Sequence, residues 1–174
     1  SSDLVGTSTE IYDYLKLLFA RVGRTYSPIS GDEVKKDSVT DVINFIEKNE
    51  GKTFLLRAPL QFEVKKFKDL LKTLKVAGFT RLEINGNLAN IEDLESFGFV
   101  PEESMEIHLV IDRFSYDNDE HFLQRLADSV QMAFYEGHGT CSLKEIETEN
   151  VKEFSNKFEL DGITFNEPNV HFFS

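Results

Sequence analysis

The sequence predicts an α+β fold in which helices pack on one side of a small mixed, mainly antiparallel sheet that extends from a helical flank. Strand and helix patterns alternate through the middle of the chain in the order strand, helix, strand, strand, helix, strand. The composition supports a packed core, because the 174 residues are 40% hydrophobic and include 16 Phe. The lone Cys141 excludes an intramolecular disulfide, and no apolar run approaches the roughly 20 residues that span a bilayer. We therefore expect a cytoplasmic protein without a membrane segment.

The first half of the sequence carries three helix patterns and one strand pattern. Thr7 and Glu10 form a capping box ahead of apolar residues at helical spacing, so a helix is expected to begin there. The run "TFLLRAPL" is typical of a buried strand that ends at its proline. The predicted elements of this half are helices at 7–22, 38–49 and 62–76 and a strand at 53–60.

The second half of the sequence is expected to return to strands. "FTRLEING" predicts a strand that enters a tight turn at Asn85-Gly86. The acidic run 92–95 is interpreted as a solvated loop, since runs of charge usually face water. Further strands are expected at 105–116 and 138–147, and between them a helix with the core stripe Phe122, Leu126, Val130 and Phe134.

The expected domain organisation places a compact unit at 27–150. Residues 1–26 and 151–174 do not fit its strand and helix order and are expected to form a second structural layer that the unit leaves and re-enters. Charge is also divided, because residues 1–87 hold 14 Lys and Arg against 12 Asp and Glu, whereas residues 88–174 hold 5 against 19. This asymmetry suggests one face for an acidic or anionic partner, although an ordinary solvated surface explains it as well.

The sequence offers no catalytic or metal motif. It contains no G-x-x-x-x-G-K-[ST] phosphate loop and no nucleophile elbow. The segment "SPISG" at 27–31 has the turn residues of a C-P-x-C-G zinc knuckle, but Ser27 and Ser30 stand where thiolates would bind the metal. We expect no bound metal, no cofactor and no enzymatic activity in this chain.

Two sets of basic residues could bind a partner. Arg81 and Arg113 are isolated guanidinium groups on predicted strands, a residue type enriched at protein interfaces, although Arg113 could instead form a structural pair with Asp112. A second set lies along one face of the 62–76 helix and could follow a DNA backbone, or could be a solvated helix face. This second set is Lys65, Lys68, Lys72 and Lys75.

The segments "VGTSTEIYDYLKLLFARVG", "RLADSV" and "GITFNEPNVHFFS" resemble, in order and spacing, the first half of the UvrA family, the damage sensors of excinuclease ABC. The resemblance implies a dimeric ABC-class ATPase of bacterial nucleotide excision repair that binds damaged DNA and hands it to UvrB. It also implies that ATP with Mg²⁺, zinc and DNA are bound by the parent protein outside this chain, which holds neither a Walker A motif nor an ABC signature. The parent is expected to be a homodimer.

Residue by residue, the resemblance implies a UvrB-binding domain at 27–150. It assigns 1–26 to signature domain I and 151–174 to a return into that domain, cut short here. Arg81 in "GFTR" and Arg113 in "VIDR" match family arginines and are expected to contact acidic groups on UvrB. Many family members carry cysteine pairs at the knuckle and near 158–162, and both pairs are missing here.

Overall fold

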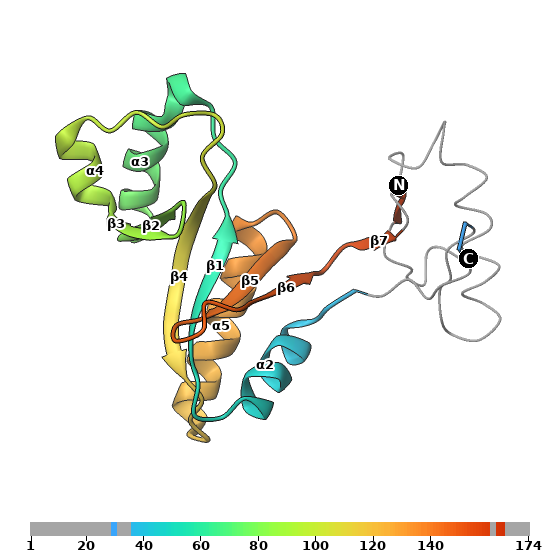
Figure 1. Cartoon of the computed structure of the whole chain (residues 1–174). Coiled ribbons are helices and arrows are strands. Elements are labelled where there is room, and N and C mark those ends of the chain that lie inside the picture. The colour runs from blue at the N-terminus through green and yellow to red at the C-terminus, as the bar shows by residue number, and fades with distance from the viewer. Residues whose placement is uncertain (1–28, 31–35, 161–162, 166–174) are drawn as a thin grey trace. The chain divides into compact units, whose positions relative to one another are not determined.

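The computed structural model describes residues 29–30, 36–160 and 163–165 (Figure 1). The chain divides into two units, one formed by Ser1–Asp37 and Asn156–Ser174 and the other by Ser38–Ser155. In the first unit, β7 (Phe158–Leu160) pairs antiparallel with β8 (Ile163–Phe165). The helix expected at 7–22 lies outside the described residues. The assignment of the flanks to a second domain stays a prediction.

A six-stranded sheet forms the frame of the Ser38–Ser155 unit. Its strand order is β3-β2-β4-β1-β5-β6, and each of its pairings is antiparallel. The predicted α+β class is confirmed, with a sheet that is antiparallel throughout. The strands are β1 (Thr53–Pro59), β2 (Arg81–Ile84), β3 (Asn87–Asn90), β4 (Ile107–Ser115), β5 (Thr140–Glu145) and β6 (Val151–Ser155).

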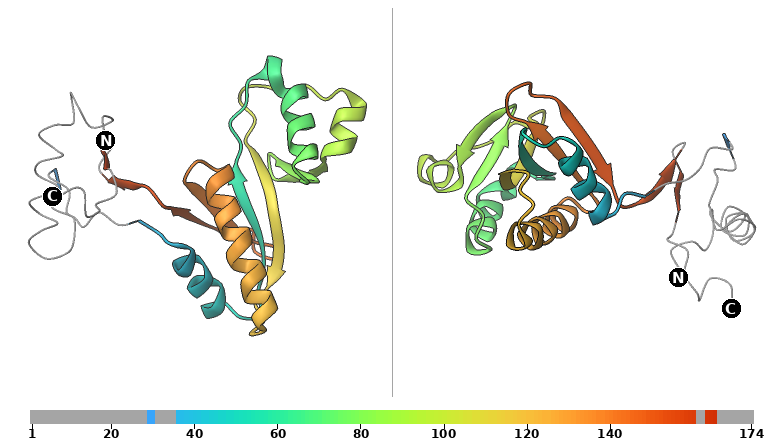
Figure 2. Two further views of the ribbon diagram at one scale, coloured as in Figure 1. Left: turned by 180° about the vertical axis from the view of Figure 1, so that it is seen from behind. Right: turned by 90° about the horizontal axis from the view of Figure 1, so that it is seen from below.

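Four helices pack on one face of this sheet (Figure 2). Phe54 and Leu56 belong to a core with α2 and α5, whereas Ala58 belongs to a core with α3 and α4. These three residues alternate along β1, so they point to the same side of the sheet and both cores lie there. The helices are α2 (Val39–Lys48), α3 (Phe67–Val76), α4 (Ile91–Phe97) and α5 (Glu120–Glu136), and the 3₁₀ turn η2 (Val64–Lys66) precedes α3.

Local sequence signals set several element ends. The Ser38 hydroxyl accepts a hydrogen bond from the Asp41 amide at 3.1 Å, and the Asp41 carboxylate accepts one from the Ser38 amide at 2.7 Å. This capping box starts α2 where the sequence predicts it. Asn85 and Gly86 have φ of 48° and 86°, so the two-residue loop between β2 and β3 has positive φ at both positions, as a twisted hairpin requires.

Several elements differ from the expectations. No strand was expected at β3, and the helix expected at 62–76 is the 3₁₀ turn η2 followed by α3. Residues 92–95 lie in helix α4, so their interpretation as a loop was wrong; Asn90 caps this helix by accepting a hydrogen bond from the Glu92 amide at 2.9 Å. Strand β6 pairs with β5 and extends the sheet beyond residue 150. Its Phe154 is 5% exposed and reaches the core with α2 and α5.

Candidate functional site

The face of the sheet opposite the four helices carries most of the charged strand residues. Glu83 lies opposite His108, and Arg57 lies opposite both Val110 and Ser142. Because residues directly opposite each other in neighbouring strands share a face, these side chains point away from the helices. We call this surface the open face; its residues on the four central strands include Arg81 and Glu83 (β2), His108, Val110 and Arg113 (β4), Leu55 and Arg57 (β1), and Ser142 and Lys144 (β5).

A β-bulge in β4 brings Arg113 onto the open face. Val110 lies opposite Arg57, but Asp112 lies opposite Leu56, which is the neighbour of Arg57 on β1. Consecutive residues on β1 point to opposite faces, so their partners Val110 and Asp112 also point to opposite faces. In a regular strand, two residues spaced in this way would share a face. The extra residue in β4 therefore turns Asp112 toward the helices and Arg113 toward the open face.

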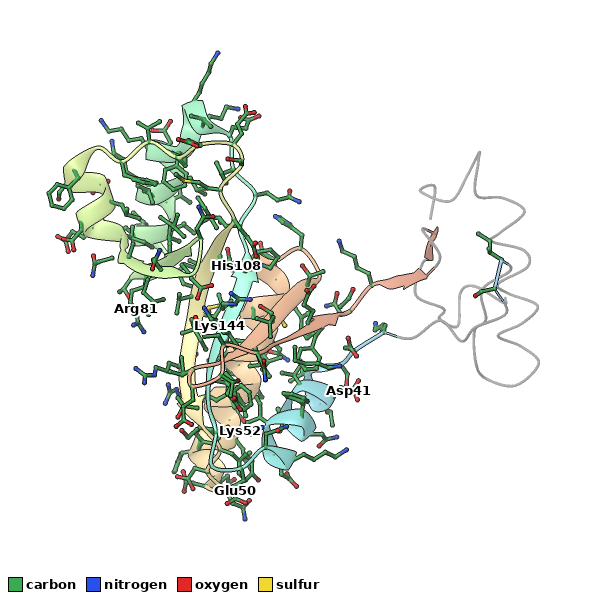
Figure 3. The ribbon with its side chains drawn as sticks, viewed as in Figure 1. Asp41, Glu50, Lys52, Arg81, His108 and Lys144 are labelled. Atoms are coloured by element: carbon green, nitrogen blue, oxygen red, sulfur yellow. The ribbon has the colours of Figure 1, made fainter. Side chains whose placement is uncertain are left out.

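Arg81 and Arg113, the two arginines predicted as partner contacts, thus share one face. Arg81 alternates with Leu82, which is buried under the helices, and Figure 3 shows Arg81 on the side of β2 turned away from α3 and α4. Among the residues that the structure describes, neither guanidinium forms an ion pair with a carboxylate. The alternative of an Arg113–Asp112 pair is wrong, because the Asp112 carboxylate binds the guanidinium of Arg125 instead.

The centre of the open face is a buried ion cluster. Glu83, whose side chain is 3% exposed, accepts hydrogen bonds from Arg57 Nη1 and from Lys144 Nζ, the latter at 2.9 Å. Arg57 Nε donates to Ser142 Oγ at 3.1 Å. Burial tends to raise the pKa of Glu83, but the hydrogen bonds from Lys144 and Arg57 together hold that pKa below its ordinary value. The cluster ties β1, β2 and β5 together and leaves Glu83 ionised.

His108 borders the cluster. Its Nδ1 lies 3.9 Å from a Glu83 oxygen, and its Nε2 lies 3.7 Å from Glu106. Burial lowers the pKa of His108 and the nearby charge of Arg57 lowers it further, while Glu106, Glu83 and Glu153 oppose the shift. The imidazole is therefore favoured in its neutral form.

A cavity of about 610 Å³ opens above the cluster on this face. Its lining includes Arg57, Glu83 and His108, together with the exposed Glu106 and Glu153. Figure 3 labels His108 and Lys144, which lie in front of β1 and β4, while α5 runs behind the sheet. A concave, charged surface on a rigid sheet suits recognition of another protein's polar side chains.

The predictions from sequence missed this cluster. Arg57 could have been noticed, because it interrupts the apolar run of its strand, and Glu83 could have been noticed between Leu82 and Ile84. The hydrogen bonds that join Glu83 to Arg57 and to Lys144 could not have been predicted, because these residues are 26 and 61 positions apart in the sequence.

The four predicted DNA-backbone lysines lie on the helix side of the unit. Lys65 is in η2 and the others are on α3, and all four are exposed. Lys75 Nζ donates to Glu95 at 2.5 Å, and this hydrogen bond, with the charge of Glu95, raises the pKa of Lys75. The positive charge of these four lysines is therefore partly neutralised by the carboxylate of Glu95. Its role in DNA binding stays a prediction.

Metal ligands do not converge in the part of the chain that the structure describes. Within residues 29–30, 36–160 and 163–165, no three His, Cys, Asp or Glu side chains form an arrangement that could hold a metal ion. Ser27 lies outside the described residues, and Ser30 is in an exposed turn. In the same described ranges, no helix has the length and apolar character to cross a membrane.

Comparison with known proteins gives a consistent match. A family model described as the UvrA interaction domain matches residues 37–147. The UvrABC system protein A of Methanothermobacter thermautotrophicus is 33% identical over 176 residues, covering 98% of this chain and 18% of that protein. Its counterpart from Thermus thermophilus is 33% identical over 156 residues (88% and 16%), and that of Rickettsia bellii is 37% identical over 145 residues (82% and 15%). The chain spans less than a fifth of the length of these curated relatives.

Proposed function

The chain belongs to the UvrA family and contains its interaction domain, and from this premise we propose that the Ser38–Ser155 unit docks UvrB through the open face during nucleotide excision repair. In this proposal the unit is an interaction module that hydrolyses no ATP. The parent protein, a cytoplasmic homodimer, binds ATP with Mg²⁺, zinc and DNA outside this chain and loads UvrB onto damaged DNA.

One observation carries the proposal. The compact unit holds four arginines, and two of them, Arg57 and Arg125, are bound to the buried or half-buried carboxylates of Glu83 and Asp112. The other two are Arg81 and Arg113 on the open face. An arginine fork without an internal carboxylate is suited to bind one on a partner, where it can donate two parallel hydrogen bonds.

Rigidity of the surrounding sheet supports the same role. The ion cluster at Glu83 joins β1, β2 and β5 on the same face as the two arginines, and β4 pairs with both β1 and β2, so the guanidinium groups are carried on a fixed frame. A preorganised surface loses less side-chain and loop freedom on binding than a loop would. Acidic side chains of UvrB opposite Arg81 and Arg113 would set both the orientation of docking and the rate of encounter.

The test is a titration of UvrB against the chain and its variants. We expect Arg81→Ala to weaken UvrB binding by about tenfold and Arg113→Glu by more, because the second change also repels an acidic partner. Lys68→Glu is the matched control, since it reverses an exposed charge on the helix side and should leave UvrB affinity unchanged. If the Arg113→Glu variant binds UvrB with unaltered affinity, Arg113 does not contact UvrB.

The alternative is contact with the DNA backbone through the exposed lysines of η2 and α3. The row of Lys65, Lys68 and Lys72 favours it, and Glu95 beside Lys75 weakens it. Fluorescence anisotropy with a DNA duplex at low and moderate salt separates the two functions, because affinity that depends on phosphate contacts falls steeply as salt rises. UvrB docking through two arginines predicts a shallower salt dependence.

A further inference from the structure

A groove between α3 and α4 is lined mainly by apolar side chains. Its cavity volume is about 380 Å³, within the range of small ligand sites. Phe67 and Leu71 of α3, each 1% exposed, close its floor, and the half-buried Leu94 of α4 and Phe99 form the opposite side. Val100 at the groove is 68% exposed, so apolar surface continues from the groove onto the outside of the unit.

The exposed apolar surface extends beyond the groove itself. Phe97, in the last turn of α4, is 85% exposed and lies one residue before Gly98, which lines the groove. A large aromatic side chain at this exposure is costly to hydrate, and contiguous apolar patches on soluble domains mark interaction sites. Both Phe97 and Val100 are within the described residues and away from the open face.

Two lysines lie on the η2 and α3 side of this groove, whereas helix α4 on the other side is acidic. Lys65 and Lys68 line it, and neither takes part in an ion pair among the described residues. The acidic lining residue is Glu95, whose carboxylate is bound by Lys75 at 2.5 Å. Apolar side chains with ammonium groups along one edge complement a segment that is apolar on one side and acidic on the other.

We propose that this groove binds an acidic amphipathic helix of a partner protein, with large apolar side chains inserted between α3 and α4. Helices of this kind bind grooves by placing residues at i, i+3 or i+4 and i+7 on the floor. On the η2 and α3 side the lining residues run from Val64 in η2 to Leu71 in α3, a wall about 12 Å long and enough for about two turns of a bound helix. Lys65 and Lys68 would bind acidic groups on its outer side.

The groove is distinct from the proposed UvrB-docking surface. Both helices pack on the face that carries Leu82, whereas Arg81 points to the opposite face. The two surfaces therefore lie on opposite sides of the sheet, and occupancy of one leaves the other accessible. The unit could hold UvrB and an acidic helix at the same time.

A DNA backbone fits the groove less well than such a helix. Phosphates would bind the lysines, but they would leave Val100 and the accessible parts of Leu94 and Phe99 in contact with water. Base stacking on Phe97 is the remaining nucleic-acid contact, and it requires single-stranded DNA. A DNA duplex is therefore a second ligand to be tested beside the helix.

The probe is a fluorescein-labelled synthetic helix of about 14 residues with Leu and Phe on one face and Glu on the other. Anisotropy with the full chain should show saturable binding, and a probe with Lys in place of Glu should not bind. Val100→Glu should weaken binding at least about tenfold, because it places a negative charge at the groove. Val76→Glu is the matched control, since Val76 is 87% exposed, lies on α3 and does not line the groove.

Four results would overturn the proposal. The first is that the acidic probe does not saturate the chain, and the second is that the Lys probe binds as tightly as the acidic one. The third is that Val100→Glu and Val76→Glu weaken probe binding equally. The fourth is that the chain binds the DNA duplex through Lys65 and Lys68 but does not bind the probe. Arg113→Glu should retain probe affinity, which separates this proposal from UvrB docking. Circular dichroism of each variant should match the unaltered chain, since both valines are exposed.

Discussion

Arg125 of α5 holds Asp112 of β4 through two hydrogen bonds, from Nε at 3.1 Å and from Nη2 at 2.5 Å. Ser129, one helical turn further, donates to the same carboxylate at 2.8 Å. Arg125 also donates to the main-chain carbonyl of Arg113 at 3.4 Å. Helix α5 therefore fixes β4 at the bulge that turns Arg113 to the open face, and the position of that guanidinium depends on a helix from the other side of the sheet.

We expect Arg125→Met to lower the free energy of unfolding by about 1.5 kcal/mol. This value is the lower end of the range that a hydrogen bond to a charged group contributes to stability. The lower end applies because the Arg125 side chain is 57% exposed. Arg125→Lys should restore only part of this loss, since an ammonium cannot donate two parallel hydrogen bonds to Asp112. Urea unfolding measures both, and equal stability of the Met variant and the unaltered chain would show that the pair contributes nothing.

The Glu83 cluster predicts a larger stability effect. Glu83→Ala leaves Arg57 and Lys144, whose side chains are 7% and 12% exposed, without their shared carboxylate. Removing one partner of a buried ion pair costs about 3–5 kcal/mol, because the remaining charge is uncompensated. Glu106→Ala is the control in urea unfolding: its side chain is 78% exposed and the change should stay within about 0.5 kcal/mol. A similar small effect in both variants would contradict the central role of Glu83.

The lowered pKa of His108 predicts that the stability of the chain depends on pH near neutrality. Its pKa in the folded state lies below the ordinary value of 6.5, chiefly because it is buried. The unfolded chain therefore takes up a proton at higher pH than the folded chain does, and stability falls as the pH drops through 6.5. Glu83 contributes in a lower window, since its pKa is held below 4.5: its contribution is present above pH 4.5 and is lost progressively as the pH falls from there through that lowered value.

The measurement compares urea midpoints of the unaltered chain and a His108→Gln variant between about pH 7.5 and about pH 5.5. The unaltered chain should lose stability over this interval, and the variant should lose less. Parallel curves for the two proteins would assign the pH dependence to other groups.

Elements with a strong local pattern could be predicted from the sequence. The stripe of α5 recurs at helical spacing: Leu126, Val130 and Phe134 are buried as expected, and Phe122 is half-buried against the same core. The Asn85-Gly86 turn was recognisable because its residues tolerate positive φ. By contrast, α4 has only Ile91 fully buried among seven residues, so its acidic sequence carries little helical periodicity.

The candidate site was only partly predictable, because its assembly depends on register. Arg81 and Arg113 are visible as isolated charges, but the face that Arg113 occupies is decided by the bulge in β4, which no residue type in that strand predicts. The partner of Asp112 is Arg125 on a distant helix rather than its sequence neighbour. Long-range contacts of this kind follow from the fold, so local sequence patterns do not reveal them.

The last prediction concerns β6, a strand that lies beyond the unit expected at 27–150. Only Phe154 of its five residues is buried, and its ring meets that of Phe45 edge-on at 5.8 Å between centroids. If β6 is an integral part of the unit, Phe154→Ala should lower the free energy of unfolding by about 3 kcal/mol, the usual cost of emptying a buried aromatic site. Val151→Ala in the same strand should cost far less, because Val151 is 46% exposed. Thermal and urea unfolding of the full chain give both values; a Phe154→Ala cost as small as that of Val151→Ala would place the end of the cooperative unit near residue 150, as the sequence alone suggests.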